Sequence, residues 1–275
     1  MKRIVKKVEN NLMQGQERIQ AAFEQAKEKQ SAALMPYFTL GYPNRSESVA
    51  AIKAVAEHAD LLELGVPFSD PIADGPTIQR STQKSLDAGT TVKGCLDMVR
   101  ELRADGVETP VMTMGYMNPL MAYGLENYVR DARAAGVDGM IVPDLPPEES
   151  AELEKLAAEN GLAYIHFLAP TSTPDRIDQV TERASGFIYM VSLTGVTGAR
   201  TQVRQGLDEF VRNVQAKTDV PVAVGFGISN PEQAGQVGEY ADGVIVGSAL
   251  IKAYDGGGVA GSAEFVKSLR DGLAS

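Results

Sequence analysis

Residues 60–77 read DLLELGVPFSDPIADGPT. The apolar run at its start predicts a buried β-strand that contains Glu63, and the Pro, Ser, Asp and Gly residues that follow predict a loop carrying Asp70 and Asp74. A carboxylate in an apolar strand is costly unless it is paired, neutralised or used. Two carboxyl groups in different surroundings are what general acid–base chemistry requires, and a loop held by the same strand can bring the second one to the first. The alternative is a buried glutamate satisfied by backbone donors, followed by two aspartates that form turns.

The same unit, a short apolar run followed by a loop and an amphipathic helix, recurs along the chain. Helices are expected over 46–57, where Ser46 could form the N-cap, and over 148–158. Strands that alternate with helices predict right-handed βαβ units and a parallel sheet, and about eight such units close into a (β/α)8 TIM barrel. The expected strands are 34–40, 61–64, 111–115, 139–142, 163–168, 187–191, 222–224 and 243–246.

One barrel domain accounts for the whole length of 275 residues, because no linker or change of composition divides the chain. Before the first strand, 14–29 carries apolar residues at helical spacing, namely Ile19, Ala22, Phe23 and Ala26. We expect an extra N-terminal helix that covers the lower mouth of the barrel. The sequence therefore predicts an arm and capping helix over 1–30 and a catalytic (β/α)8 barrel over 31–275.

Composition excludes several classes of function. The net charge of −10 disfavours nucleic-acid binding, which requires a basic face. A single cysteine, Cys95, leaves no internal disulfide and suits a reducing compartment. The N-terminal basic residues, among them Lys2 and Arg3, are not followed by a signal-peptide core, and no run is long enough to span a membrane. A cytoplasmic protein is expected.

Three glycine-rich segments follow the last three expected strands. They are GVTG at 195–198, GFGIS at 225–229 and GS at 247–248, the last with a helical pattern after it. In (β/α)8 barrels, the loops after strands seven and eight and a nearby helix N-terminus often hold a phosphate through free backbone N–H groups. The alternative for any one segment is a turn glycine, but the three together predict a small phosphorylated substrate.

Several kinds of chemistry lack the residues that they need. No lysine lies in an expected strand, so a Schiff-base aldolase has no obvious nucleophile. The two histidines, His58 in an expected helix and His166 in an expected strand, do not form a metal site, and polar or core roles are favoured for both. A nucleophile elbow, a Walker loop and a dinucleotide fingerprint are also missing. The remaining candidates are the carboxylate pair, Tyr189 at the end of the sixth expected strand and the phosphate cradle. Such a site needs no cofactor if the substrate supplies its own electron sink.

Six motifs resemble those of the tryptophan synthase alpha subunit in order and spacing: MPYFTLGYP, LELGVPFSDPIADGPTIQ, GYMNPL, GVTGAR, VGFGIS and VGSA. The resemblance runs from about residue 36 to residue 248 and departs mainly in the basic arm, residues 1–13. It implies a (β/α) barrel that cleaves indole-3-glycerol phosphate to indole and glyceraldehyde 3-phosphate. It also implies an alpha2beta2 complex with a beta subunit, which carries the pyridoxal phosphate and receives the indole through a tunnel; no cofactor is expected in this chain.

The resemblance implies a role for each candidate residue. Glu63 is the acid–base group at indole C3 and at the glycerol hydroxyl, and Asp74 stays ionised beside the indole N–H. Tyr189 lines the site in support of the glutamate. The expected phosphate-binding positions are Gly198, Gly227, Gly247 and Ser248.

Further roles concern the indole ring, loop closure and the partner. Tyr37, Ile78 and the aliphatic residues of the third strand are expected to hold the indole ring, although a core role is equally compatible with their chemistry. Loops 66–74 and 193–206 are expected to close over substrate, with Thr197 bonding the loop aspartate. Pro71, Asn118 and Pro119 resemble residues that face the beta subunit, and the alternative for each is an ordinary turn residue.

Two other functions remain open from the sequence. Another phosphate-binding barrel enzyme, such as a phosphoribosyl isomerase or the synthase that forms indole-3-glycerol phosphate, would share the glycines. It would not need the carboxylate pair, and the synthase would require strand lysines. A scaffold subunit with a dead site would have lost Glu63, Asp74 or the phosphate glycines, and all of these are present.

Overall fold

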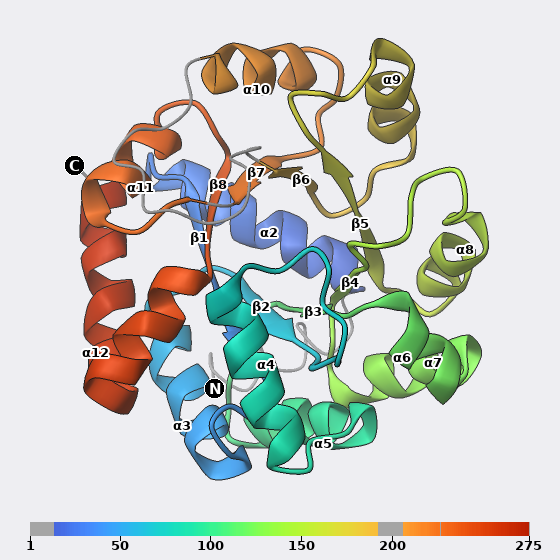
Figure 1. The fold of residues 1–275 in the computed structure, drawn as a ribbon. Helices are drawn as coiled ribbons and strands as arrows, with labels where there is room; N and C mark the ends of the chain where they lie inside the picture. The colour runs from blue at the N-terminus through green and yellow to red at the C-terminus, as the bar shows by residue number, and fades with distance from the viewer. Residues whose placement is uncertain (1–13, 192–205, 226, 275) are drawn as a thin grey trace, which may run out of the picture.

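Eight parallel strands close into a barrel in the order β1 to β8, each paired with its neighbours in sequence and β8 with β1 (Figure 1). The computed structural model describes residues 14–191, 206–225 and 227–274. The fold is therefore the predicted (β/α)8 TIM barrel. The strands are β1 (Ala33–Thr39), β2 (Leu62–Gly65), β3 (Val111–Met114), β4 (Gly139–Ile141), β5 (Ala163–Leu168), β6 (Ile188–Val191), β7 (Val222–Gly225) and β8 (Gly243–Val246).

Helices alternate with the strands and form the outer ring of the barrel (Figure 1). Each of them except the first, α2, turns its apolar stripe toward the strands and so buries the barrel's outer face. They are α2 (Gly15–Glu28), α3 (Arg45–Ala56), α4 (Pro76–Asp87), α5 (Val92–Ala104), α6 (Met117–Tyr123), α7 (Leu125–Ala135), α8 (Ala151–Glu159), α9 (Pro174–Arg183), α10 (Leu207–Gln215), α11 (Pro231–Gly238) and α12 (Ser248–Leu273).

All eight predicted strands are present, with ends that differ by at most one residue from the expected ones. Helix starts were predicted less well. The N-cap of α3 is Asn44 rather than Ser46: the Asn44 side chain accepts a hydrogen bond from Glu47 N at 3.1 Å, and Ser46 Oγ donates to the same oxygen. The helix expected over 148–158 begins only at Ala151, because a turn occupies 147–149. His58 lies in the turn after α3 rather than in a helix.

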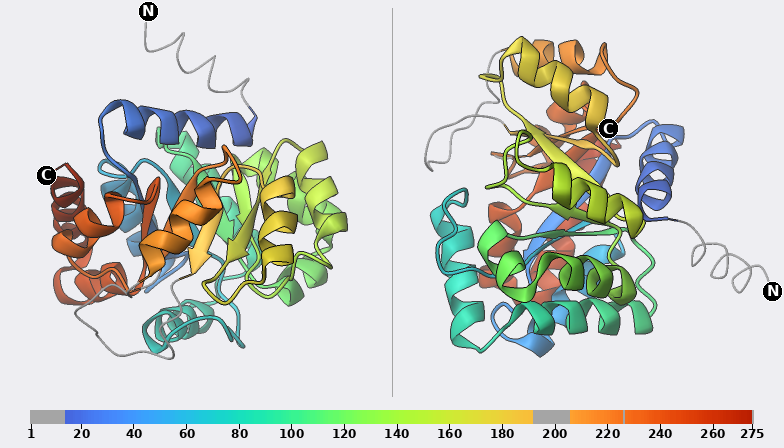
Figure 2. Two further views of the ribbon diagram at one scale, coloured as in Figure 1. Left: turned by 90° about the horizontal axis from the view of Figure 1, so that it is seen from above. Right: turned by 90° about the vertical axis from the view of Figure 1, so that its right-hand side faces the viewer.

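The predicted extra helix, α2, lies across one end of the barrel (Figure 2). It buries Ile19 and Phe23 there, and the Phe23 ring packs 5.8 Å from that of Phe187. Arg18 Nε lies 3.2 Å from the buried Asp138 carboxylate, immediately before β4. A Cβ at Gly15 would lie 2.0 Å from the Asp138 carbonyl oxygen, so only glycine permits this close approach. The helix thus closes the amino-terminal mouth, and the carboxyl-terminal mouth is left for the site.

The long helix α12 follows β8 directly and is kinked at Gly258, whose φ of 59° and ψ of −147° are not helical. Its first part, which begins at Ser248, therefore runs in a different direction from the part after Gly258. Among the helices that the structure describes, none combines the length and the apolar character needed to cross a bilayer.

Candidate active site

Glu63 is the second residue of β2 and is 1% exposed. Its neighbours across the ladder are Tyr37 on β1 and Met112 on β3. Burial, reinforced by the negative charge of Asp74, raises the pKa of Glu63 to about 8. Its Oε2 has no hydrogen-bond partner among the described residues. A carboxylic acid that is protonated at neutral pH and has one oxygen unused is suited to donate a proton to a bound molecule.

Asp74 ends the loop after β2 and immediately precedes Gly75, the N-cap of α4. Its Oδ2 accepts a hydrogen bond from the Tyr116 hydroxyl at 2.9 Å, and the same hydroxyl accepts from Ala73 N at 3.0 Å. Burial raises the pKa of Asp74 to about 6, and the Tyr116 hydrogen bond opposes the rise. At neutral pH this side chain is therefore mostly an anion, next to a protonated Glu63.

The other aspartate of the loop, Asp70, is placed differently. It is exposed, and its carboxylate accepts a hydrogen bond from the adjacent Ser69 hydroxyl at 2.5 Å. The negative charge that raises the pKa of Glu63 belongs to Asp74 and not to Asp70. The structure thus brings Asp74 to Glu63 and leaves Asp70 in solvent.

Two tyrosines flank the carboxyl pair. Tyr189 was expected at the end of the sixth strand but is the second residue of β6, and it is 4% exposed. Burial raises its pKa, and the negative charge on Glu63 raises it further. Tyr37 lies in β1, and its pKa is raised by burial and then by the charge on Asp74. Each ring covers a glycine on the next strand: a Cβ at Gly225 would lie 2.5 Å from the Tyr189 hydroxyl, and one at Gly65 would lie 2.1 Å from that of Tyr37. Both phenols are held neutral over the barrel mouth.

Apolar side chains complete the wall of this site. Ile78, in the first turn of α4, is 6% exposed. Thr113 on β3 receives a hydrogen bond from Tyr128 of the surrounding α7, so Thr113 points outward and its neighbours Met112 and Met114 point into the barrel. The inward residues of the third strand are therefore methionines, whose flexible thioethers suit an aromatic ring.

The predicted phosphate positions lie at the same end of the barrel. Gly227 follows β7 with a φ of +88°, a conformation that favours glycine, and a Cβ there would meet no atom within 4 Å. Gly247 is the N-cap of α12 and Ser248 is its first residue. The first N–H groups of this helix have no partner within it, and together with the helix dipole they favour an anion. Thr197, Gly198 and most of the 193–206 loop lie outside the described residues.

The two histidines have different surroundings. His166, on the outer face of β5, is 3% exposed, and its Nε2 lies 3.2 Å from Glu154 Oε1. The backbone carbonyl of His58 accepts hydrogen bonds from the Arg270 guanidinium. Within the described ranges no group of His, Cys, Asp or Glu is arranged to hold a metal ion, and the eight strands contain no lysine.

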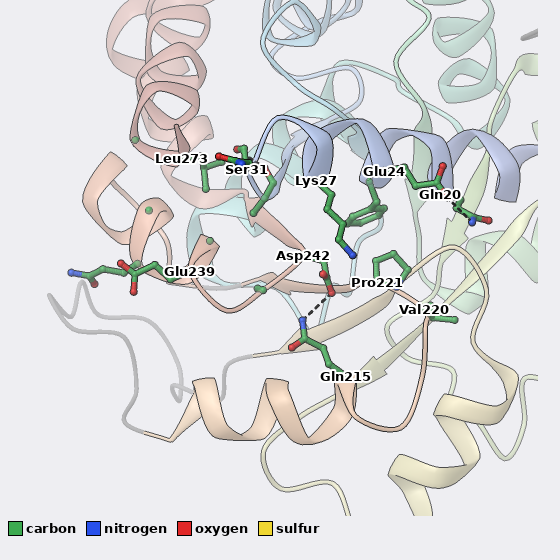
Figure 3. A pocket seen from close by; sticks show the side chains of 18 of the residues that line it. Gln20, Glu24, Lys27, Ser31, Gln215, Val220, Pro221, Glu239, Asp242 and Leu273 are labelled. Atoms are coloured by element: carbon green, nitrogen blue, oxygen red, sulfur yellow. Dashed lines mark hydrogen bonds between the residues drawn. The ribbon is translucent and has the colours of Figure 1, made fainter. Parts of the chain in front are cut away.

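A broad groove of about 1430 Å³ lies at the opposite end of the barrel, beside α2 (Figure 3). Several of its side chains are acidic, including Glu24, Glu239 and Asp242. Asp242 is already engaged, because it accepts hydrogen bonds from Gln215 Nε2 at 3.0 Å and from Val222 N at 2.9 Å. Since parallel barrels place their chemistry at the carboxyl ends of the strands, we do not assign the reaction to this groove.

Sequence reasoning missed Tyr116 as a site residue. The available signal was its position two residues after the end of β3, within the motif GYMNPL, where a side chain reaches the barrel mouth. Its pairing with Asp74 joins the loops after β2 and β3, and local sequence does not specify such a contact.

A closed parallel barrel with a buried, protonated glutamate beside an ionised aspartate at its carboxyl-terminal mouth defines an acid–base enzyme of the (β/α)8 class. A family model described as "Tryptophan synthase alpha chain" matches residues 23–267. The chain belongs to this family of carbon–carbon lyases.

Individual relatives agree with the family model. The tryptophan synthase alpha chain of Chloroflexus aggregans is 50% identical over 235 residues, which cover 85% of this chain and 88% of that protein. That of Chloroflexus aurantiacus is 47% identical over 94% of this chain and 98% of its own length. Among solved structures, a chain of Mycobacterium tuberculosis tryptophan synthase superposes with a TM-score of 0.88 at 40% identity, covering 94% of this chain and 98% of the other.

Proposed function

We propose that this chain cleaves indole-3-glycerol phosphate by a retro-aldol reaction, with Glu63 as the acid–base group and Asp74 as the stabilising anion. The observation that carries the proposal is the buried Glu63, whose pKa of about 8 keeps it protonated beside an aspartate whose pKa is about 6. Membership of the tryptophan synthase alpha chain family supports the same reaction.

The reaction balances on these two groups and the substrate. Protonated Glu63 gives its proton to C3 of the indole ring, and the positive charge that develops on the ring nitrogen is stabilised by the Asp74 carboxylate. The Glu63 carboxylate then takes the proton of the hydroxyl on the carbon attached to the ring. As that oxygen becomes a carbonyl, the carbon–carbon bond breaks and its electron pair returns to the ring. Indole and glyceraldehyde 3-phosphate are released, and Glu63 is protonated again.

This scheme requires no electron sink other than the protonated indole ring. We therefore propose that the chain uses no organic cofactor and no metal for this step. Tyr189 would support the glutamate from β6, and Tyr37 and Ile78 would hold the indole ring with Met112 and Met114.

Gly227, Gly247 and Ser248 are the proposed phosphate-binding positions, together with Gly198. The first turn of α12 supports this assignment, because its free N–H groups lie at the same mouth as the carboxyl pair. Thr197 remains the proposed partner of Asp74 on loop closure.

A tryptophan synthase beta subunit is the proposed partner, in an alpha2beta2 complex in which the beta subunit carries the pyridoxal phosphate. Pro71, Asn118 and Pro119 would face it. Two large apolar side chains beside them support a contact here: Ile72 is 82% exposed and Met121 is 59% exposed. We also propose the division into an arm and capping helix, 1–30, and a catalytic barrel, 31–275. The buried, free Cys95 is compatible with the cytoplasm, the compartment that we propose.

Indole release tests the proposal directly. The full chain is incubated with indole-3-glycerol phosphate, with and without a beta subunit, and indole is measured alongside the Glu63→Gln variant. Release by the parent chain and not by the variant is the expected result. A parent chain that binds the substrate but releases no indole under either condition would instead favour a scaffold role.

A further inference from the structure

Three buried hydroxyl groups form a continuous hydrogen-bonded row under the start of α4. The Tyr37 hydroxyl lies 3.3 Å from Thr39 Oγ1, and Thr39 Oγ1 lies 2.7 Å from Ser81 Oγ. Ser81 Oγ then donates to the carbonyl oxygen of Ile78 at 2.8 Å. Thr39 and Ser81 are both fully buried and Tyr37 is 6% exposed, so the row is shielded from water.

The end of this row determines the direction of every hydrogen bond in it. A carbonyl oxygen only accepts, and each hydroxyl carries a single proton. The Ser81 proton is therefore used on Ile78, the Thr39 proton must go to Ser81, and the Tyr37 proton must go to Thr39. The phenol oxygen of Tyr37 consequently presents lone pairs, and no proton, to the barrel mouth.

Tyr37 stands between the two halves of the site. On one side its ladder neighbour is Glu63, and its hydroxyl lies over Gly65 on β2. On the other side is β8, where a Cβ at Gly247 would lie 3.4 Å from the Tyr37 Cβ. A glycerol chain that joins a ring at Glu63 to a phosphate at Ser248 must pass this residue.

We propose that the Tyr37 phenol oxygen accepts a hydrogen bond from the substrate hydroxyl on the carbon between the reacting carbon and the phosphate-bearing carbon. This assignment rests on the proposed function. The hydroxyl of the reacting carbon gives its proton to Glu63, so the middle hydroxyl is the remaining glycerol donor. Thr39 and Ser81 are positioning residues, because they act only by fixing the direction of the Tyr37 proton.

The direction of the row makes a prediction about specificity. Glyceraldehyde 3-phosphate and dihydroxyacetone phosphate are isomers of the same charge. The first has a hydroxyl, a donor, at the middle carbon, and the second has a carbonyl, an acceptor, in its place. An acceptor on the protein binds the first and disfavours the second, because two acceptors that face each other leave both unpaired.

Equilibrium titration of the full chain with both triose phosphates and with inorganic phosphate tests the proposal. Tyr37→Phe removes the acceptor and keeps the ring. We expect its affinity for glyceraldehyde 3-phosphate to fall about 3- to 10-fold, as for loss of one neutral hydrogen bond, with dihydroxyacetone phosphate and phosphate unchanged. In turnover, KM for indole-3-glycerol phosphate should rise more than kcat falls.

Variants of the row test its direction. Ser81→Ala leaves the Thr39 proton without its acceptor, so Thr39 turns to Tyr37 and the phenol proton faces the site. The preference for glyceraldehyde 3-phosphate should then narrow or reverse, and Tyr37→Phe in the same chain should remove any affinity for dihydroxyacetone phosphate that Ser81→Ala has gained. Thr39→Ser keeps the hydroxyl and should keep the preference. Ser85→Ala is the matched control: Ser85 is also buried on α4 and donates to a carbonyl, Leu40 O, at 2.6 Å, but it is not part of the row.

Two results would overturn the inference. A loss of affinity shared by all three ligands in Tyr37→Phe would mean that the residue acts by packing, and unchanged affinity for glyceraldehyde 3-phosphate would mean that the hydrogen bond is not formed. Should Tyr37→Phe fail to fold, the relative affinity of Ser81→Ala for the two triose phosphates tests the proposal alone, and an unchanged preference for glyceraldehyde 3-phosphate overturns it. Failure of the proposed function is distinguishable, because the parent chain would then release no indole whatever its preference between the triose phosphates.

Discussion

The pH dependence of indole release should have two limbs that are set by the two carboxyl groups. Asp74 must be ionised and Glu63 protonated, so activity rises with pH through about 6 and falls through about 8. Because the two carboxyl groups interact, the apparent pKa values of the two limbs are properties of the pair. Tyr116→Phe perturbs only the acid limb, because the lost hydroxyl donates to Asp74 Oδ2 at 2.9 Å and stabilises its charged form.

The size of the shift follows from that hydrogen bond. A hydrogen bond to a charged group contributes about 1.5 kcal/mol at the lower end of its range, and one pKa unit corresponds to about 1.4 kcal/mol. The pKa of Asp74 should therefore rise by about one unit in Tyr116→Phe. At pH 6 the ionised fraction, and with it kcat/KM, should drop about five-fold, while near pH 8 the loss should be small.

The assay is the pH profile of kcat/KM for indole release from pH 5 to pH 9. Tyr123→Phe is the matched control, because Tyr123 also donates to an aspartate, Asp131 Oδ2, at 2.7 Å but lies on α6, away from the site. We expect its profile to coincide with that of the parent. An acid limb that stays in place in Tyr116→Phe, or that moves equally in Tyr123→Phe, would refute the assignment of this limb to Asp74.

Further substitutions address the other parts of the site. Glu63→Gln should lower indole release by roughly 10²–10⁴-fold with fold and substrate binding retained, and turnover within a few-fold of the parent would remove Glu63 from the mechanism. Asp74→Asn should be nearly inactive and Asp70→Asn close to the parent; the reverse order would show that the exposed aspartate is the functional one. Gly227→Asp and Ser248→Asp should weaken binding of glyceraldehyde 3-phosphate and inorganic phosphate but not of indole, because each places a negative charge where the phosphate should bind. Titration with all three ligands measures this, and unchanged phosphate affinity would mean that these loops are only turns.

Stability offers an independent check on the burial of Glu63. The pKa of Glu63 is raised from 4.5 to about 8 by burial, and below pH 4.5 it is protonated in both the folded and the unfolded chain. Between these values the unfolded chain loses the proton and the folded chain keeps it, so this residue's contribution to stability falls as pH rises and is constant above about 8. The parent chain should thus lose stability relative to Glu63→Gln over this range, by a few kcal/mol at most.

Local sequence determined the order and type of the barrel elements. The apolar runs of β1 to β8 and the helical spacing of α2 depend on side-chain periodicity, which is a property of neighbouring residues. The N-cap predicted for α3 was wrong, because Asn44 and Ser46 are both suitable caps. The choice between them depends on where the chain leaves β1, and a short window of sequence does not contain that information.

The carboxyl pair was predictable in part. A glutamate in an apolar strand is unusual enough to identify Glu63 from the sequence, but Asp70 and Asp74 lie in the same loop and have the same side chain. Local sequence does not distinguish them, and the choice of Asp74 rested on the family resemblance. The folded loop supplies the physical reason, because Tyr116, from the end of another strand, binds Asp74 and leaves Asp70 in solvent.

The row from Tyr37 through Thr39 to Ser81 was decided by tertiary structure alone. Tyr37 and Thr39 are close in sequence, but Ser81 comes from α4, three elements later, and the packing of α4 on β1 brings the hydroxyls into contact. The sequence by itself determined which elements form and which rare residue types they carry, because periodicity and composition are local. The pairing of side chains from different elements, with the resulting pKa values and proton directions, arises only when the barrel closes, because burial and hydrogen-bond distances do not exist before the elements pack.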